Sequence, residues 1–284
     1  MKTLFTVSFL LTTAILFAQP TIVKQAIVNT TTNIIAPEEE DVQNIQGQGS
    51  GAGMNFRNMM DGEMKFTTYL KNDLVKTIIK TEMGRSTIIR NNEKKLTTTL
   101  IEMMGNKMGF YATDEEMADM QKKRDSMMQA RRKKDSSAPQ APAVTTEKTI
   151  DISYTEDTKK IAGYVCKKAY VITTGLLGLK DTAVVWYTPE FKLLNVLSTG
   201  GMSGFGNMGT TLGGLDKIDG FVMRYEMNMR RNRRMEVEVT KVDFKKEIED
   251  KEFEVPKDFD LKPMKDMQGM FGGQGGFQMR RPQQ

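Results

Sequence analysis

Hydrophobic and polar residues alternate with a period of two along much of this chain. Side chains two positions apart on a β-strand point to the same face, so each such stretch predicts a strand with one apolar and one polar face. The alternation covers Thr149–Tyr154, Phe221–Met229 and, less sharply, Met64–Leu70. Strands that are apolar on one side favour an antiparallel sheet with one covered face.

The parity of the alternation changes within the segment 237–244. Val237 and Val239 share one parity, whereas Val242 and Phe244 share the other. One extra residue in a strand restores a common face, so the pattern predicts a β-bulge near Thr240–Lys241 that bends the strand.

Turn-forming residues divide the alternating segments. Asn91-Asn92 and Gly105-Asn106 each stand between two such segments and predict β-hairpins. Glu156-Asp157 predicts a turn after Thr149–Tyr154, although Ile161–Gly163 offers a second position for it. Together these signals predict a sheet of about nine to eleven strands.

Two stretches have helical features. Thr21–Ile35 is ambiguous, because its apolar residues fit one face of a helix while its threonines favour a strand. Asp114–Lys134 is clearer, since acidic residues occupy its first turn and basic residues its last, as the helix dipole favours. Arg124 falls on the same face as Met120 and Met127, so we expect a surface or lid helix rather than a core helix.

The N-terminal segment has the layout of a cleaved export signal. Met1–Ala18 has one lysine, then an apolar run, then small residues, so cleavage is expected between Ala18 and Gln19. The apolar run is shorter than the roughly 20 residues that span a bilayer, and a retained N-terminal anchor is the alternative. We expect an exported protein, with the periplasm as the first location and the extracellular space as the second.

Four stretches rich in glycine, proline or polar residues predict loops or disorder, at 41–61, 131–146, 199–216 and 263–284. We therefore divide the chain into a signal peptide at 1–18, an N-terminal segment and linker at 19–61, a β domain at 62–262 and a disordered tail at 263–284. The β domain contains a helical insert at 114–134 and a linker at 135–146.

Composition argues against several classes of enzyme. Histidine is absent, which removes Ser-His-Asp and Cys-His catalysis and histidine-ligated zinc. Cys166 is the only cysteine; we expect a small buried side chain, with a reactive thiol or an intermolecular disulfide as alternatives. We expect no enzymatic activity, no catalytic residue, no metal-binding residue and no cofactor.

The formal net charge of +5 is spread along the chain, with basic stretches at Arg131–Lys134 and Arg230–Arg234. Such stretches are typical of a solvated face, and contact with an anionic membrane is the alternative. Export and the lack of an aromatic-rich recognition motif argue against nucleic acid as a partner. The pattern leaves the oligomeric state open.

Methionine is the compositional outlier, with 23 residues. Thioethers suit Cu(I), so a methionine-based copper site is one interpretation. Flexible apolar side chains in a core, or against an apolar ligand, are the other. The glycine-rich segment 200–214 lacks the signature of a phosphate-binding loop, and its Phe205 is a candidate to gate a cavity.

The segment from Glu147 to Pro263 has a distinctive order of motifs. In chain order these are TEDTKKIAGYVCKKAYV (Thr155–Val171), AVVWYTPEF (Ala183–Phe191), the glycine-rich loop, FVMRYEMNM (Phe221–Met229), VEVTKVDF (Val237–Phe244) and FEVPKDF (Phe253–Phe259). This order resembles the LolA/LolB-like lipoprotein-carrier superfamily, specifically an uncharacterised exported branch of it. The resemblance implies a mainly β (α+β) fold: a curved antiparallel half-barrel sheet with one or two covering helices and long flexible loops. In the carriers, the concave cavity holds acyl chains.

The leading hypothesis is a non-enzymatic exported binding protein that holds an apolar or amphipathic ligand, an acyl chain or a lipoprotein segment, in the half-barrel. The candidate ligand-binding residues, expected to point inward, are Trp186, Phe205, Phe221, Met223, Tyr225 and Met227. The alternative is a structural or interaction protein of the cell envelope with a filled core and another envelope protein as its partner. Cu(I) binding ranks third.

Overall fold

The computed structural model describes residues 20–35, 62–81, 84–135, 149–174, 180–193, 214–228 and 233–267. These residues form a mainly β structure with one α-helix, α1 (Asp114–Asp135). The strands in chain order are β1 (Thr21–Val23), β2 (Gln25–Ile35), β3 (Gly62–Lys71), β4 (Leu74–Thr81), β5 (Gly84–Asn91), β6 (Leu96–Met103), β7 (Asn106–Thr113), β8 (Thr149–Ile161), β9 (Tyr164–Thr174), β10 (Lys180–Thr188), β11 (Phe191–Leu193), β12 (Phe221–Asn228), β13 (Arg234–Asp243) and β14 (Asp260–Pro263). Short 3-10 helices, η4 (Leu215–Lys217), η5 (Asp250–Phe253) and η6 (Met264–Met267), complete the described elements.

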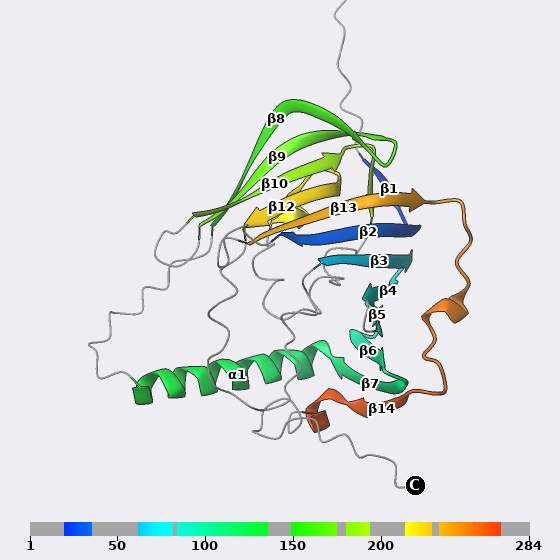
Figure 1. The fold of residues 1–284 in the computed structure, drawn as a ribbon, viewed down its shortest axis with the longest axis vertical. Coiled ribbons are helices and arrows are strands. Elements are labelled where there is room, and N and C mark those ends of the chain that lie inside the picture. The colour runs from blue at the N-terminus through cyan, green and yellow to red at the C-terminus, as the bar shows by residue number, and fades with distance from the viewer. Residues whose placement is uncertain are drawn as a thin grey trace, which may run out of the picture.

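Twelve of these strands form one sheet in the order β14-β7-β6-β5-β4-β3-β2-β13-β12-β10-β9-β8. The sheet is curved and open, with β14 at one edge and β8 at the other (Figure 1). Its pairs are antiparallel except for β14, which runs parallel to β7. β1 and β11 form a separate parallel pair. The predicted curved, mainly antiparallel sheet is therefore confirmed, with more strands than the turn signals indicated.

Bulges bend the sheet where β8 to β13 meet β2. The pairing of β13 with β2 shifts between Val239 and Lys241, which confirms the predicted bulge. A second shift lies between β10 and β12, and a third lies in β8 between Tyr154 and Thr158. Because an extra residue raises the local twist and bends a strand, these three positions explain why the sheet curls at this end.

The hairpins follow the predicted turn residues with one exception. Residues 92–95 join β5 to β6, and Met104-Gly105 joins β6 to β7, as predicted. The turn predicted at Glu156-Asp157 is wrong, because β8 continues through these residues to Ile161. The chain reverses at Ala162-Gly163 instead, where φ angles of 47° and 90° match the tight two-residue turn that joins β8 to β9.

The stretch 21–35 forms strands, so its helical interpretation is wrong. β2 pairs with β13 on one side and with β3 on the other. Its β-branched threonines, valine and isoleucines suit a central strand, and pairing with two neighbours satisfies its backbone groups.

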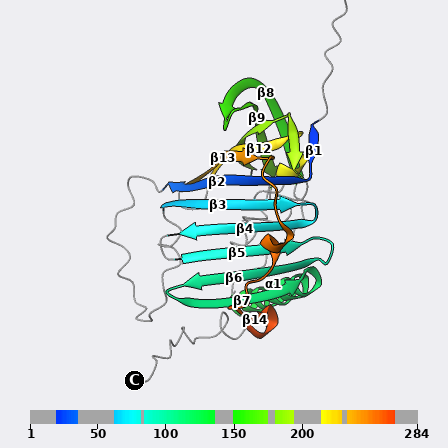
Figure 2. The same ribbon diagram turned by 90° about the vertical axis from the view of Figure 1, so that its right-hand side faces the viewer.

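A segment at residues 244–259, here called the strap, joins β13 to β14 and crosses the outer face of the sheet (Figure 2). Ile248 and Phe253 are buried against Ile27, Ile89 and Leu100, which point outward from β2, β5 and β6. Lysines on the sheet also bind the strap, with Lys71 Nζ 2.6 Å from Asp250 Oδ1 and Lys107 Nζ 2.5 Å from Asp258 Oδ2.

Helix α1 begins directly after β7 and extends away from the sheet edge (Figure 1). Thr113 and Glu116 cap it reciprocally, since the Glu116 carboxylate accepts from the Thr113 amide at 3.0 Å and the Glu116 amide donates to Thr113 Oγ1 at 3.2 Å. Arg90 Nη2 binds Asp114 Oδ2 at 2.7 Å and lowers the pKa of this carboxyl group. Most of the described side chains of α1 are exposed or half-buried, as expected for a surface helix. None of the helices in the described part of the chain combines the length and hydropathy needed to cross a membrane.

The described structure continues a few residues past the expected domain end at position 262. Pro263 ends β14, and η6 follows it. The Leu261 side chain of β14 packs against Gly109 of β7, where an added Cβ would lie 2.6 Å from Leu261 Cδ2. The missing side chain of Gly109 therefore makes room for the last strand.

Candidate functional site

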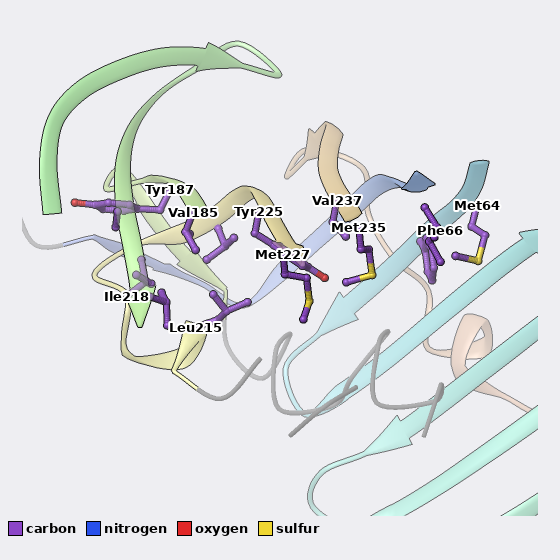
Figure 3. Close-up of a cluster of buried hydrophobic side chains, with 14 of the residues drawn as sticks. Met64, Phe66, Val185, Tyr187, Leu215, Ile218, Tyr225, Met227, Met235 and Val237 are labelled. Carbon is purple, nitrogen blue, oxygen red and sulfur yellow. The ribbon is translucent and has the colours of Figure 1, made fainter. Parts of the chain in front are cut away.

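The candidate site is the concave, apolar face of the sheet. A group of buried side chains, here called the concave cluster, lies on this face and draws on eight strands (Figure 3). Its members are Ile34, Met64, Phe66, Ile79, Ile88, Ala169, Val171, Val185, Tyr187, Leu215, Ile218, Val222, Tyr225, Met227, Met235 and Val237. The strap covers the opposite face. Its partners Ile27, Ile89 and Leu100 occupy strand positions whose side chains point away from the concave cluster, because successive residues of a strand point to opposite faces.

One row of directly opposed residues crosses the middle of this face. It runs through Ala169, Val185, Tyr225, Val237, Thr32 and Met64, on β9, β10, β12, β13, β2 and β3. Each of these residues is buried. Burial raises the pKa of the Tyr225 phenol, so this group is neutral at physiological pH.

The 3-10 helix η4 packs against the end of the concave cluster that β8 and β9 form. Leu215 and Ile218 are buried within the cluster (Figure 3). Gly214 lies so close to the sheet that an added Cβ would be 3.3 Å from Val171 Cγ1. Leu215 and Ile218 are the only described members of the cluster that do not belong to the sheet.

The structure divides the predicted ligand-binding residues between two clusters. Tyr225 and Met227 belong to the concave cluster. Phe221 and Met223 are buried in a second group, here called the bend cluster, against which Trp186 is packed. The expectation that these side chains share one apolar face is wrong. Trp186 pairs with Arg224 and Tyr187 pairs with Val222, so β12 has one extra residue between these pairs. Residues of β12 before and after this bulge therefore differ in which positions point to a given face.

The bend cluster fills the region where the sheet curls. Phe191 stacks on Phe221 with ring centroids 5.2 Å apart and meets Phe244 and Tyr164 edge-on at 4.9 and 5.1 Å. Its buried members are Ala26, Val28, Ile161, Cys166, Phe191, Leu193, Phe221, Met223 and Val239. These members come from six strands, so we interpret the bend cluster as structural.

Trp186 points away from the concave face, opposite its neighbours Val185 and Tyr187. The ammonium groups of Lys168 and Lys159 lie 5.8 and 5.9 Å from its ring centroid. These cation–π contacts occupy the indole with the protein's own side chains. Phe205 and the expected cleavage residues Ala18 and Gln19 lie outside the described residues.

Sequence reasoning did not select several central members of the concave cluster as site residues. Phe66, Tyr187 and Met235 are each buried within it. The alternation of Met64 and Phe66 was visible in the sequence, but which strands lie next to β12 and β13 was not. Met235 is directly opposite Met227, and neither residue reveals this pairing by its position in the chain.

The opposite face of β12 and β13 is polar. Arg224 forms ion pairs with Glu226 at 2.6 Å, with Glu238 at 2.9 Å and with Glu236 at 3.4 Å. Arg224, Glu236 and Glu238 also line a groove of about 270 Å³, together with Thr31, Asn33, Glu63 and Thr240. The same strands therefore present an apolar face inward and a charged face outward.

Two observations concern the titratable groups of the described residues. Within the described residues, no three His, Cys, Asp or Glu side chains come together in a way that would hold a metal ion. The Cys166 thiol is buried, and burial raises its pKa from 9.0 to about 11. A thiol with a raised pKa is a poor nucleophile at neutral pH.

Comparisons with known proteins identify a family and a weak structural likeness. A family model described as "Domain of unknown function (DUF4412)" matches residues 53–259. No curated protein matches the chain. Two solved structures of PNGF-II, one in the P21 and one in the C2 space group, are similar to it at 16% and 15% identity, each with a TM-score of 0.34. The matches cover 86% of this chain but only 33% and 32% of those chains, so it spans about a third of their length.

Proposed function

We propose that this chain, which belongs to the family described as a domain of unknown function (DUF4412), is a non-enzymatic binding protein for an apolar or amphipathic ligand. The ligand class we propose is an acyl chain or a lipid-modified protein segment. The observation that carries the proposal is the concave cluster, an apolar face to which eight strands of an open sheet contribute.

The two faces of β12 and β13 differ sharply in polarity. On β12 and β13 the inward residues are Tyr225, Met227, Met235 and Val237, whereas the outward residues Arg224, Glu226, Glu236 and Glu238 are charged. Burial of apolar surface contributes about 25 cal/mol per Å², so an acyl chain laid along such a face gains most of its affinity from contact area. Ligand sites are typically of this kind, largely apolar with few polar groups.

The outer face of the sheet already has its cover, which the strap supplies. On the concave side, Leu215 of η4 and Ile218, which follows it, are the described members of the cluster from outside the sheet. The methionines of this face support the same proposal, because thioether side chains adapt to ligands of different shape.

The proposed setting is the periplasm, and the support for it is the sequence of residues 1–18. An exported protein in that compartment encounters acyl chains of lipids and lipoproteins. The absence of histidine from the sequence supports a binding role over catalysis.

The test is binding of a fluorescent long-chain acyl methyl ester to the purified full-length chain, with native mass spectrometry of protein isolated from its own cell envelope. Met227→Ala on the concave face is expected to lower the affinity for the probe about tenfold, since it removes apolar contact area. Leu100→Ala, which creates a similar cavity beneath the strap, is the matched control and should leave the affinity unchanged.

A second candidate is a structural or interaction protein of the cell envelope whose concave face is a filled core. Close burial of large side chains favours it, since Tyr225 and Met227 are each 5% exposed and Met235 is 1% exposed. Failure of the full-length chain to bind the acyl probe, together with a ligand-free mass for the native protein, would establish this alternative over the first.

A further inference from the structure

The concave cluster surrounds one polar side chain that has no partner. Thr32 is 2% exposed, and its Oγ1 has no hydrogen-bond partner among the residues that the structure describes. Directly opposite Thr32 lie Val237 on β13 and Met64 on β3, both members of the concave cluster. The hydroxyl group is therefore near the middle of an otherwise apolar row.

Other buried threonine hydroxyls in the sheet do have partners. Thr77 Oγ1 lies 3.2 Å from Thr68 Oγ1, and Thr188 Oγ1 accepts from the Glu190 amide at 3.4 Å. A buried hydroxyl without a partner destabilises the fold relative to valine, which has the same shape and no polar atom. Stability alone would therefore favour valine at position 32.

We propose that Thr32 is the polar contact of the concave site and that its hydroxyl donates a hydrogen bond to a carbonyl oxygen of the ligand. This inference rests on the proposed function and specifies its ligand class. A few polar groups inside an apolar site commonly fix the position of a ligand, and an orphaned hydroxyl at the centre of the face is suited to that role.

The surroundings of Thr32 also determine the charge of the ligand group. The described residues directly opposite Thr32 are Val237 and Met64, the next in the row is Tyr225, and none of the three is charged. A carboxylate buried there would lose its hydration without gaining a counter-ion, which is strongly unfavourable. The geometry therefore selects a neutral ester or amide carbonyl over the free carboxylate of a fatty acid.

Apolar surface on both sides of Thr32 is consistent with this choice. Val185 and Tyr225 continue the row in one direction beyond Val237, and Phe66 and Ile79 extend the apolar face in the other. An ester or amide joins two arms, so its carbonyl can lie at Thr32 while both arms contact apolar side chains. A free fatty acid has its polar group at one end.

The experiment compares three ligands with the same chain length, methyl palmitate, palmitate and hexadecane, by displacement of the fluorescent acyl ester. Wild type is expected to prefer methyl palmitate. Thr32→Val should lower the affinity for methyl palmitate about tenfold and leave the affinity for hexadecane unchanged, because the substitution removes one hydrogen bond and keeps the shape of the side chain. Thr32→Ser retains the hydroxyl and should keep the preference for the ester.

Three results would count against the inference. Equal affinity of wild type and Thr32→Val for methyl palmitate, with hexadecane bound by both, overturns it and leaves the proposed function in place. Preference of wild type for palmitate over its methyl ester overturns the neutral-carbonyl assignment. Binding of none of the three ligands overturns the proposed function and this inference together. The melting temperature of each variant, followed by circular dichroism, shows whether it is folded.

Discussion

At the scale of single residues, Cys166 illustrates how burial determines chemistry. Its side chain is fully buried in the bend cluster, and Sγ lies 3.6 Å from the carbonyl oxygen of Tyr164. Burial is the main cause that raises the pKa of this thiol to about 11, while a hydrogen bond from the backbone of Ile161 acts in the opposite direction. The side chain is small and buried, as expected.

We predict that Cys166 reacts slowly with iodoacetamide in the native protein at pH 8 and rapidly after unfolding in guanidinium. The folded-state pKa of about 11 lies above the unfolded value of 9.0, so the unfolded thiol ionises first as the pH rises. The stabilisation from this group is complete below pH 9 and is lost between pH 9 and 11. Rapid labelling of the folded protein at pH 8, measured by mass spectrometry, would contradict the assignment of a buried neutral thiol.

At the scale of elements, the strap combines two kinds of interaction with different energies. Phe253 is 8% exposed and packs in the cluster on the outer face of β2, β5 and β6. The carboxylate of Asp250 binds Lys71 at 2.6 Å but is 81% exposed. Water screens an exposed ion pair, whereas a buried aromatic ring cannot be replaced by solvent without loss.

We therefore predict that Phe253→Ala lowers the free energy of unfolding by about 3–5 kcal/mol, because it removes a buried aromatic ring and leaves a cavity. Asp250→Asn, the matched control in the same strap, should lower it by no more than about 1 kcal/mol. Urea unfolding of both variants measures the difference. A larger loss for Asp250→Asn than for Phe253→Ala would show that charge rather than packing holds the strap.

At the scale of the whole molecule, the methionines separate into interior and surface groups. Met64, Met223, Met227 and Met235 are buried in the concave and bend clusters. Met104 and Met127 are 64% and 61% exposed. This division assigns several of the methionines to packing and leaves others in contact with solvent.

Oxidation by dilute hydrogen peroxide should follow this division. We predict that Met104 and Met127 form sulfoxides first, and that Met223 and Met235, each 1% exposed, react only after unfolding. Peptide mass spectrometry against time gives the rates. Oxidation of Met235 as early as Met127 would mean that the concave cluster opens to solvent in the native state.

Local patterns allowed much of the secondary structure to be predicted. The strands at 221–228 and 149–154, the bulge near Thr240 and the hairpin at Asn91-Asn92 depend on neighbouring residues, and each was confirmed, although a bulge divides the apolar residues of 221–228 between two clusters. The helix predicted at Asp114–Lys134 has charged residues of the expected sign in its first and last turns, and it was also confirmed. The stretch 21–35 was ambiguous because its propensities conflict, and pairing with two distant strands decided in favour of β-structure.

The candidate site could be predicted only in part. Tyr225 and Met227 were selected correctly as members of the concave cluster, whereas Phe221 and Met223 were assigned to the same face in error. The extra residue in β12 that separates them is recognisable only against its partner strand β10. The unpartnered hydroxyl of Thr32 has no local signal, because whether a hydroxyl finds a partner depends on residues far away in the chain.

The sequence by itself determined most of the strands, several of the turns, the helix at Asp114–Lys134 and the apolar side of several strands, because these properties arise from residues within a few positions of one another. The tertiary structure alone decided the order of the strands, the crossing of the strap over the outer face and the meeting of Thr32 with Val237 and Met64. Contacts between distant segments depend on how apolar faces pack together in three dimensions, and a period of two is compatible with many such arrangements.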